Sequence, residues 1–158
     1  MTPEHQHHLL IIEDDQGLAN SMKILFSRSG FTVDTASNAS ESRMRIDEHR
    51  PCFIFLDILL PGESGLEFLE ELRRDKSFKN TPIFVLTQFH DEAYQQEAKR
   101  LNVTAYFVKA EHSLKDIMDQ VMKALEKCRR GDCGPWEGHQ ESVATEEQSI
   151  KKKKPRST

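Results

Sequence analysis

The sequence predicts an α/β fold in which one five-stranded parallel sheet is doubly wound between two layers of helices. Between residues 8 and 130, short apolar segments alternate with longer segments of helical periodicity. Several of the short segments are unbroken apolar runs, which is typical of strands that helices cover on both faces. Five strand–helix units of this size imply right-handed crossovers within a single three-layer αβα sandwich.

The five predicted strands come first. They are Leu9–Ile12, Phe31–Thr35, Cys52–Leu56, Ile83–Leu86 and Thr104–Val108. Pro51 and Pro82 stand just before two of these strands, where a missing backbone N–H is tolerated. The two prolines therefore mark where the third and fourth strands begin.

Helical periodicity follows each strand. Apolar residues fall on one face in the first helix (Leu18, Met22, Leu25, Phe26), the third (Leu66, Leu69, Leu72) and the last (Leu114, Ile117, Met118, Val121, Leu125). The second and fourth helices, around Ser40–His49 and Asp91–Leu101, are only weakly amphipathic.

Local signals predict where several helices begin and end. Asn38, Ser64 and Ser113 are each followed three residues later by an acidic residue, which predicts a helix N-cap at each position. Gly30 stands where the first helix is expected to stop.

Domain organisation follows from length and composition. The chain has 158 residues, which predicts one domain, and its apolar share of 37% lies below the globular average of roughly 45–50%. Residues 131–158 hold five acidic and five basic side chains but few apolar ones, too few to offset the entropy lost on ordering. We therefore expect one domain at residues 8–130 and a disordered tail at 131–158.

Charge and hydropathy exclude several classes of protein. The net charge of −4 argues against a nucleic-acid-binding body, which usually has a basic surface. No apolar run approaches the ~20 residues that a membrane helix needs. The polar start, Met1–His8, lacks the apolar segment of a signal peptide. The sequence thus predicts a cytoplasmic protein with no direct nucleic-acid binding and no membrane insertion.

Cysteine usage gives a weak metal signal. Cys128, Cys133 and His139 could supply three zinc ligands, but structural zinc sites usually have four ligands at tighter spacing. Free thiols are the preferred interpretation.

Polar side chains gather where the predicted strands end. Glu13, Asp14 and Asp15 follow the first strand, Asp57 the third, Thr87 the fourth and Lys109 the fifth. Ligands of open α/β sheets bind outside the carboxyl ends of the strands, so these groups are expected at one edge. Taken singly, each is better explained as a turn residue, a helix cap or a surface residue. Their joint placement predicts a site.

The chemistry of this set narrows its use. Clustered carboxylates repel one another unless a cation is present, and Mg²⁺ takes one or two carboxylates together with waters and a phosphate. The Lys109 ammonium could pair with Asp57 or with a phosphate oxygen, and the Thr87 hydroxyl could bind another such oxygen. Asp57 would then be the nucleophile that accepts a phosphoryl group as an aspartyl phosphate.

The sequence around these polar residues resembles the receiver domain of two-component response regulators. The order and separation of the matching stretches agree with that family from residue 8 to about 127. The most specific feature is the spacing of Pro61 and Gly65 from Asp57. The stretches are Leu10–Asp15, Phe55–Leu66, Leu86–Thr87 and Tyr106–Lys109. The resemblance implies the flavodoxin-like (CheY-like) form of the doubly wound sheet.

The resemblance also implies roles for individual residues. Asp57 resembles the phospho-acceptor and Lys109 the lysine that pairs with the phosphate. Asp14 resembles the direct Mg²⁺ ligand, with Glu13 helping through water. Asp57 and the backbone carbonyl of Leu59 would complete the protein ligands.

A switch is implied as well. Thr87 and Tyr106 resemble the pair in which the hydroxyl moves to the phosphate while the ring turns inward. A strand aromatic packed on the fourth helix explains Tyr106 equally well. The last helix–strand–helix face is where such a change would be expressed, and its charged residues allow a homodimer.

The sequence departs from the family at three positions. Ala110 follows Lys109 where proline is common, Gln88 stands where a small residue is common, and Leu59 is apolar. None of these changes removes a chemical group from the predicted pocket, so we expect phosphorylation to survive. The size of the conformational response is the property they affect.

The implied function is that of a stand-alone receiver, which is not an enzyme beyond its own aspartyl phosphorylation and dephosphorylation. Its partners would be a histidine kinase or histidine phosphotransfer protein and a downstream protein target. The alternative is a receiver-like interaction module that is never phosphorylated. A haloacid-dehalogenase-like phosphatase is disfavoured, because it requires a second acidic residue at the position of Leu59. A flavodoxin-like nucleotide or flavin binder is disfavoured as well, because no glycine-rich loop follows the first strand.

Overall fold

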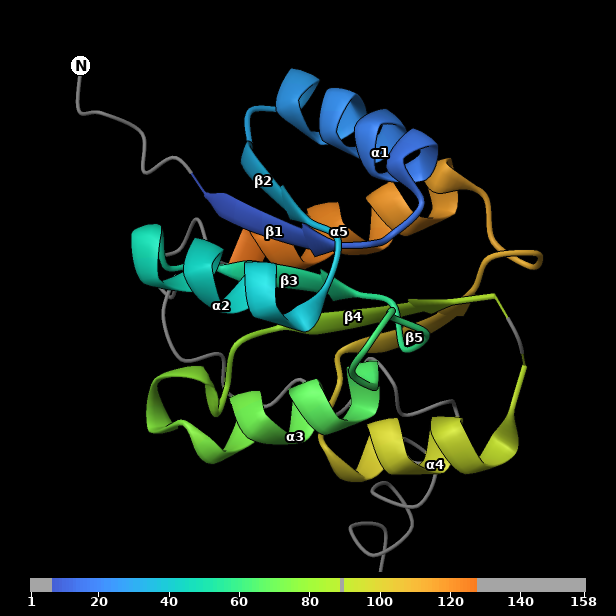
Figure 1. Ribbon diagram of the computed structural model, residues 1–158. Helices are drawn as coiled ribbons and strands as arrows, with labels where there is room; N and C mark the ends of the chain where they lie inside the picture. Colours follow the sequence, from blue (N-terminus) through green and yellow to red (C-terminus); the bar gives the residue numbers. More distant parts are fainter. Residues whose placement is uncertain (1–6, 89, 128–158) are drawn as a thin grey trace, which may run out of the picture.

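The computed structural model describes residues 7–88 and 90–127 and contains one parallel sheet with helices on both faces (Figure 1). The elements are β1 (His8–Ile12), α1 (Gln16–Arg28), β2 (Thr32–Ala36), α2 (Ala39–Glu48), β3 (Phe53–Leu56), α3 (Gly65–Arg74), the 3₁₀ helix η1 (Lys76–Phe78), β4 (Ile83–Thr87), α4 (Glu92–Arg100), β5 (Ala105–Val108) and α5 (Leu114–Lys127). The strand order is β2-β1-β3-β4-β5. The predicted doubly wound α/β fold is confirmed.

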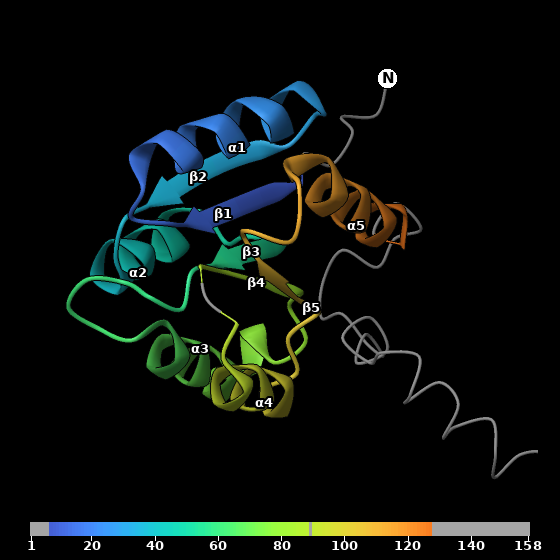
Figure 2. The same ribbon diagram turned by 90° about the vertical axis from the view of Figure 1, so that its right-hand side faces the viewer.

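The two helix layers divide between the faces of the sheet. Helices α1 and α5 cover one face, and α2, α3 and α4 cover the other (Figure 2). Every strand pair is parallel, and the register aligns Ile12 with Ala36 of β2 and with Leu56 of β3. The carboxyl ends of the strands therefore form one common edge.

Aromatic rings fill the core beneath α1 and α5. Phe55 stacks on Phe84 with ring centroids 5.1 Å apart, and Phe26 of α1 meets Phe31 edge to face at 5.7 Å. Ile117 and Val121 of α5 are buried against the same cluster, as the apolar stripe of this helix predicts. Leu125, which belongs to the predicted stripe, lies outside the side chains that the structure describes.

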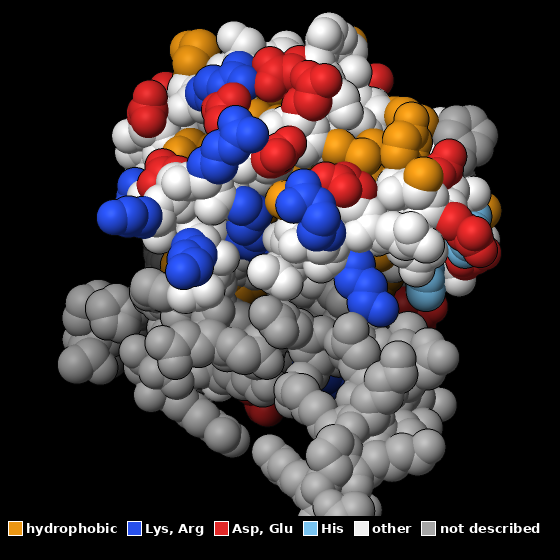
Figure 3. All heavy atoms as spheres, turned by 90° about the horizontal axis from the view of Figure 1, so that it is seen from below, with side chains coloured by type: hydrophobic (Ala, Val, Ile, Leu, Met, Phe, Trp, Pro, Cys, Tyr) orange, Lys and Arg blue, Asp and Glu red, His pale blue; other side chains and the backbone are white. Residues whose placement is uncertain are grey.

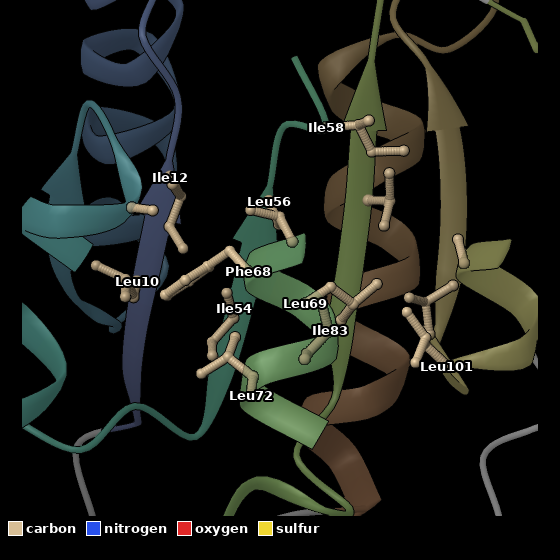
Figure 4. Close-up of a cluster of buried hydrophobic side chains, with 14 of the residues drawn as sticks. Leu10, Ile12, Ile54, Leu56, Ile58, Phe68, Leu69, Leu72, Ile83 and Leu101 are labelled. Atoms are coloured by element: carbon tan, nitrogen blue, oxygen red, sulfur yellow. The ribbon is translucent and has the colours of Figure 1, made fainter. Parts of the chain in front are cut away.

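Aliphatic residues dominate the core beneath α2, α3 and α4. Figure 4 shows Phe68 reaching from α3 toward Leu10 and Ile12 of β1, with Leu72 near Ile54. These side chains are almost completely buried. Unbroken apolar strands are thus explained by two cores, one on each face of the sheet.

The end of α1 illustrates how local sequence sets the element boundaries. Gly30 adopts φ +98°, its N–H donates to the Ser27 carbonyl at 3.1 Å, and the Phe31 N–H donates to the Phe26 carbonyl at 3.2 Å. This is the Schellman arrangement. It occupies Phe31, so β2 begins at Thr32 rather than at the predicted Phe31.

The predicted N-caps are confirmed. Asn38 accepts from the Glu41 N–H at 2.7 Å, Ser64 from the Leu66 N–H at 3.2 Å, and Ser113 from the Asp116 N–H at 3.1 Å. Each of these side chains satisfies a backbone donor at the start of a helix.

The surface of α3 and α4 carries charges of both signs. Figure 3, a view from below, shows acidic and basic side chains interspersed over this face. Some pair along one helix, as Arg74 does with Glu70 at 3.3 Å. Exposed pairs of this kind contribute little to stability.

Some expectations concern residues beyond the described part of the chain. The tail at 131–158, the domain end at residue 130 and the set Cys128, Cys133 and His139 all lie there. Among the described helices, none is both long enough and apolar enough to span a membrane.

Candidate functional site

The site is built by residues that directly follow or end four strands. Glu13 and Asp14 follow β1, Asp57 follows β3, Thr87 ends β4 and Lys109 follows β5. Because the strands are parallel, these residues meet at one edge of the sheet, as predicted. The acidic pocket therefore lies where open α/β sheets bind their ligands.

Asp57 is held firmly at the centre. Its side chain is 5% exposed, and its backbone N–H donates to the Ile12 carbonyl at 3.0 Å. Oδ1 accepts from the Leu59 N–H at 2.9 Å, and Oδ2 accepts from the Lys109 ammonium at 3.1 Å. Both carboxylate oxygens are thus oriented before any ligand arrives.

Lys109 joins the two buried carboxylates. Its Nζ lies 2.5 Å from Glu13 Oε1 as well as 3.1 Å from Asp57 Oδ2. Burial alone would lower the pKa of the ammonium, but Glu13 and Asp57 outweigh burial and raise its pKa above the usual value. The ammonium therefore stays charged. The backbone N–H of Lys109 donates to the Thr87 carbonyl at 2.7 Å, and this hydrogen bond fixes the start of the loop after β5.

Glu13 is the carboxyl group whose ionised form is least favoured at this site. Burial and the neighbouring Asp57 raise the pKa of its carboxyl to about 8, against the opposing effect of Lys109. Apart from the ion pair with Lys109, neither of its buried carboxylate oxygens has a hydrogen-bond partner among the described residues. A buried carboxylate without such partners is costly. The pocket is therefore short of positive charge.

A divalent cation fits this deficit. One carboxylate oxygen from each of Glu13, Asp14 and Asp57 lies within 4.8 Å of the others. With all three carboxyl groups ionised, three carboxylates and one ammonium leave two negative charges, and oxygen ligands of this kind suit Mg²⁺. Asp14 is exposed, so it faces the solvent from which an ion would enter. The Leu59 carbonyl stays a predicted fourth ligand.

Two unpartnered hydroxyls lie on the α3–α4 side of the sheet. Thr87 Oγ1 and the Tyr106 hydroxyl are buried, and neither has a hydrogen-bond partner among the residues that the structure describes. The register pairs Val85 with Tyr106 and Thr87 with Val108, which puts both hydroxyls on one face. Burial, followed by the charge of Asp91, raises the pKa of the Tyr106 hydroxyl. Both groups are free to take a new acceptor.

The loop after Asp57 depends on a glycine. A Cβ on Gly65 would lie 2.4 Å from the Asp57 carbonyl oxygen and 2.6 Å from the Ile58 Cα. The Gly65 N–H donates to the Ile58 carbonyl at 2.8 Å. Only a residue without a side chain allows this close approach. The fixed spacing of Gly65 from Asp57 thus has a steric cause.

Asp15, the last residue of the acidic run, belongs to the helix rather than to the pocket. It is the N-cap of α1, and its Oδ1 accepts from the Leu18 N–H at 3.2 Å. This is the ordinary role of an aspartate after a strand. The Leu59 N–H is the opposite case, because it orients Asp57 but residue types alone give no sign of it.

The three departures from the family pattern lie at the rim. Gln88 and Ala110 are exposed, Leu59 is 38% exposed, and the Lys109–Ala110 peptide bond is trans. None of the three replaces a charged or hydroxyl group of the pocket.

Comparison with known proteins places the fold and pocket in context. The family described as response regulator receiver domain matches residues 9–122. The chain is 36% identical over 80 residues to the response regulator Rre1 of Synechocystis sp., a match that covers 50% of this chain and 35% of that protein. It is 26% identical over 117 residues to sporulation initiation phosphotransferase F of Bacillus subtilis, covering 74% of this chain and 92% of that protein.

A solved structure gives the same fold. The crystal structure of a response regulator receiver domain protein from Methanospirillum hungatei JF-1 matches with a TM-score of 0.72 and 21% identity, covering 80% of this chain and 98% of that one. The chain spans about a third to a half of the length of the first curated relatives that it matches.

Proposed function

Since the chain belongs to the response regulator receiver domain family, we propose that it accepts a phosphoryl group on Asp57 and signals by phosphorylation-dependent protein binding. The donor is a histidine kinase or a histidine phosphotransfer protein. This family is a signalling module of two-component systems rather than a classical enzyme. The observation that carries the proposal is the buried Asp57–Lys109 pair beside an under-neutralised Glu13 and an unpartnered Thr87 hydroxyl.

The transfer step follows from these groups. A carboxylate oxygen of Asp57 attacks phosphorus, forming an O–P bond while the bond from phosphorus to the donor nitrogen breaks. The electron pair of that bond leaves with the donor imidazole. Lys109 pairs with the negative oxygens of the transferring group, and Thr87 donates its hydroxyl to one of them. Mg²⁺ held by Glu13, Asp14, Asp57 and the Leu59 carbonyl would neutralise phosphoryl charge.

The same groups suggest how the signal leaves the pocket. A phosphoryl oxygen on Asp57 offers the Thr87 hydroxyl its missing acceptor, and Thr87 then moves toward it. Space on the α3–α4 side becomes available to the Tyr106 ring. The change is expressed at α4, β5 and α5, the surface where we propose that a target or a second copy binds.

Stand-alone action is part of the proposal. The matched relative named sporulation initiation phosphotransferase F is covered over 92% of its length, so a relative barely longer than this fold exists. We therefore propose that this receiver signals directly through a protein target.

Intact mass after incubation with acetyl phosphate and Mg²⁺ tests the proposal. We expect a gain of one phosphoryl group that is absent in Asp57→Asn and in metal-free buffer. A short-lived product is covered by a parallel binding test with beryllofluoride. If neither reaction nor binding occurs, the chain acts as an unphosphorylated interaction module, the alternative for which Gln88 and Ala110 are the sequence signals.

A further inference from the structure

A second cluster of ionisable side chains lies away from the acidic pocket. His8 is the first residue of β1, Asp34 is in β2, and His49 is the C-cap of α2. The register pairs His8 with Thr32 and Leu10 with Asp34, so His8 and Asp34 project from the same face. Helix α2 packs on this face and brings His49 to them.

The two histidine side chains converge on one carboxylate oxygen of Asp34. His8 Nε2 lies 2.7 Å and His49 Nδ1 lies 3.4 Å from the same oxygen, Asp34 Oδ2. The two imidazole rings stack with centroids 5.0 Å apart and planes at 29°. One ligand atom from each residue lies within 4.8 Å of the others. Side-chain exposure is 14% for His8, 24% for Asp34 and 62% for His49, so solvent reaches the cluster from the His49 side.

We propose that His8, Asp34 and His49 form a binding site for Zn²⁺. Two imidazoles and one carboxylate are a zinc donor set, with a fourth position left for water. Zinc bonds of about 2.0–2.2 Å place tetrahedral ligand atoms roughly 3.4 Å apart. The His49–Asp34 separation of 3.4 Å already meets this value, and His8 Nε2, at 2.7 Å from Asp34 Oδ2, would move away by about 0.7 Å to meet it.

The surroundings favour a cation at this point. His49 ends α2, and the carbonyl end of a helix attracts positive charge. The donor chemistry also separates this site from the acidic pocket, whose oxygen ligands suit Mg²⁺. Zinc would join the edge strand β2, its neighbour β1 and helix α2, and thus stabilise this edge of the sheet.

Calorimetric titration with ZnCl₂ in excess Mg²⁺ tests the site. The full chain is used with Cys128→Ser and Cys133→Ser, so that these thiols do not compete. We expect one ion per chain and a rise in Tm with zinc. His49→Gln is the main variant because its side chain is 62% exposed, so its loss should cost little stability, and His8→Gln is the second. Loss of either ligand should weaken zinc binding by more than the roughly 10- to 100-fold that loss of an outer-shell partner costs.

His90→Gln is the matched control, because His90 is exposed and lies outside the cluster. It should leave zinc affinity and the Tm rise unchanged. Absence of stoichiometric zinc binding would overturn the proposal. Binding that His49→Gln leaves intact would also overturn it, since the ion would then be held elsewhere, for example by the other histidines near the N-terminus.

Discussion

Three neighbours hold Asp57 in position for reaction, each by a different contact. The Leu59 N–H fixes one oxygen, the Lys109 ammonium fixes the other, and the Ile12 carbonyl holds the backbone. Glu13 competes for the same ammonium. The carboxylate is thus positioned at little further entropic cost when a phosphoryl donor arrives.

Thr87→Val tests whether the Thr87 hydroxyl is truly unpartnered. The substitution keeps the shape of the side chain and removes no hydrogen bond to a described residue. The free energy of unfolding should therefore either rise or fall by no more than about 0.5 kcal/mol relative to the wild type. Ser42→Ala is the contrast, because the buried Ser42 Oγ donates to the Asn38 carbonyl at 2.7 Å and its loss should cost about 1 kcal/mol. Urea denaturation measures both. A loss above about 1 kcal/mol in Thr87→Val would reveal a partner in the folded protein.

Gly65→Ala tests the steric cause of the glycine after Asp57. The new Cβ would overlap backbone atoms at 2.4–2.8 Å, so the loop must shift, and we expect a loss of about 2–4 kcal/mol. Gly17→Ala is the matched control, since its Cβ would meet only the flexible Asp15 carboxylate at 3.3 Å. Its effect should stay within about 0.5 kcal/mol. Equal unfolding midpoints for the two variants would refute the steric account.

At the scale of elements, one arginine ties three segments together. Arg73 of α3 donates to the carbonyls of Phe78, Lys79 and Thr81 around η1 and to those of Leu101 and Asn102 after α4. Burial lowers the pKa of its guanidinium to about 10, so it remains charged at neutral pH. Its planar fork of donors matches these acceptors in a way that lysine does not.

Arg73→Lys should therefore destabilise the protein by about 2 kcal/mol, because several carbonyls, three of them in part-buried contacts, lose their donors. Arg74→Lys is the control, since the Arg74 side chain is 77% exposed. We expect it to stay within about 0.5 kcal/mol of the wild type in thermal or urea unfolding. Similar losses in both variants would show that the carbonyl contacts of Arg73 contribute little.

Helices α2 and α3 are joined by a salt bridge with a predicted pH dependence. Arg43 donates to Glu71 at 2.7 Å from both Nε and Nη2, and this holds the pKa of the Glu71 carboxyl below its usual value despite partial burial. A folded pKa below the unfolded one adds stability above the unfolded pKa. That stability is lost as the pH falls through the folded pKa.

Glu71→Gln should therefore lower the free energy of unfolding at pH 7 by no more than about 1 kcal/mol, because the pair is half exposed. The difference from the wild type should vanish at pH values below the folded pKa of Glu71. Glu67→Gln, on the exposed side of the same helix, is the control. Urea midpoints across an acid pH series measure the effect, and a difference that persists unchanged at low pH would contradict this assignment.

For the molecule as a whole, the sequence predicts those features that local pattern determines. Asp57 and Lys109 could be placed because each directly follows an apolar run, and parallel strands bring such positions to one edge. The ends of the predicted strands differ from the observed ends by at most one residue, and at Phe31 the cause is the cap of α1. Arg73 and the His8–Asp34–His49 cluster could not be foreseen, because no local sequence pattern marks their partners; His8 and Asp34, for example, lie 26 positions apart.

The fold also separates two kinds of chemistry in one molecule. Oxygen ligands gather at the carboxyl edge, and the imidazole cluster joins β1, β2 and α2. Both assemblies bring together residues from neighbouring parallel strands. Phosphorylation and zinc binding are therefore independent claims with separate tests.

Identifying the modified residue is the most direct test of whether Asp57 is the acceptor. Borohydride reduces an aspartyl phosphate to homoserine, so peptides can be analysed by mass spectrometry after treatment with acetyl phosphate and Mg²⁺. We predict homoserine at Asp57 alone, and none when Mg²⁺ is removed. Homoserine at Asp14 or at another carboxyl, or a phosphoryl group that persists in Asp57→Asn, would contradict the account.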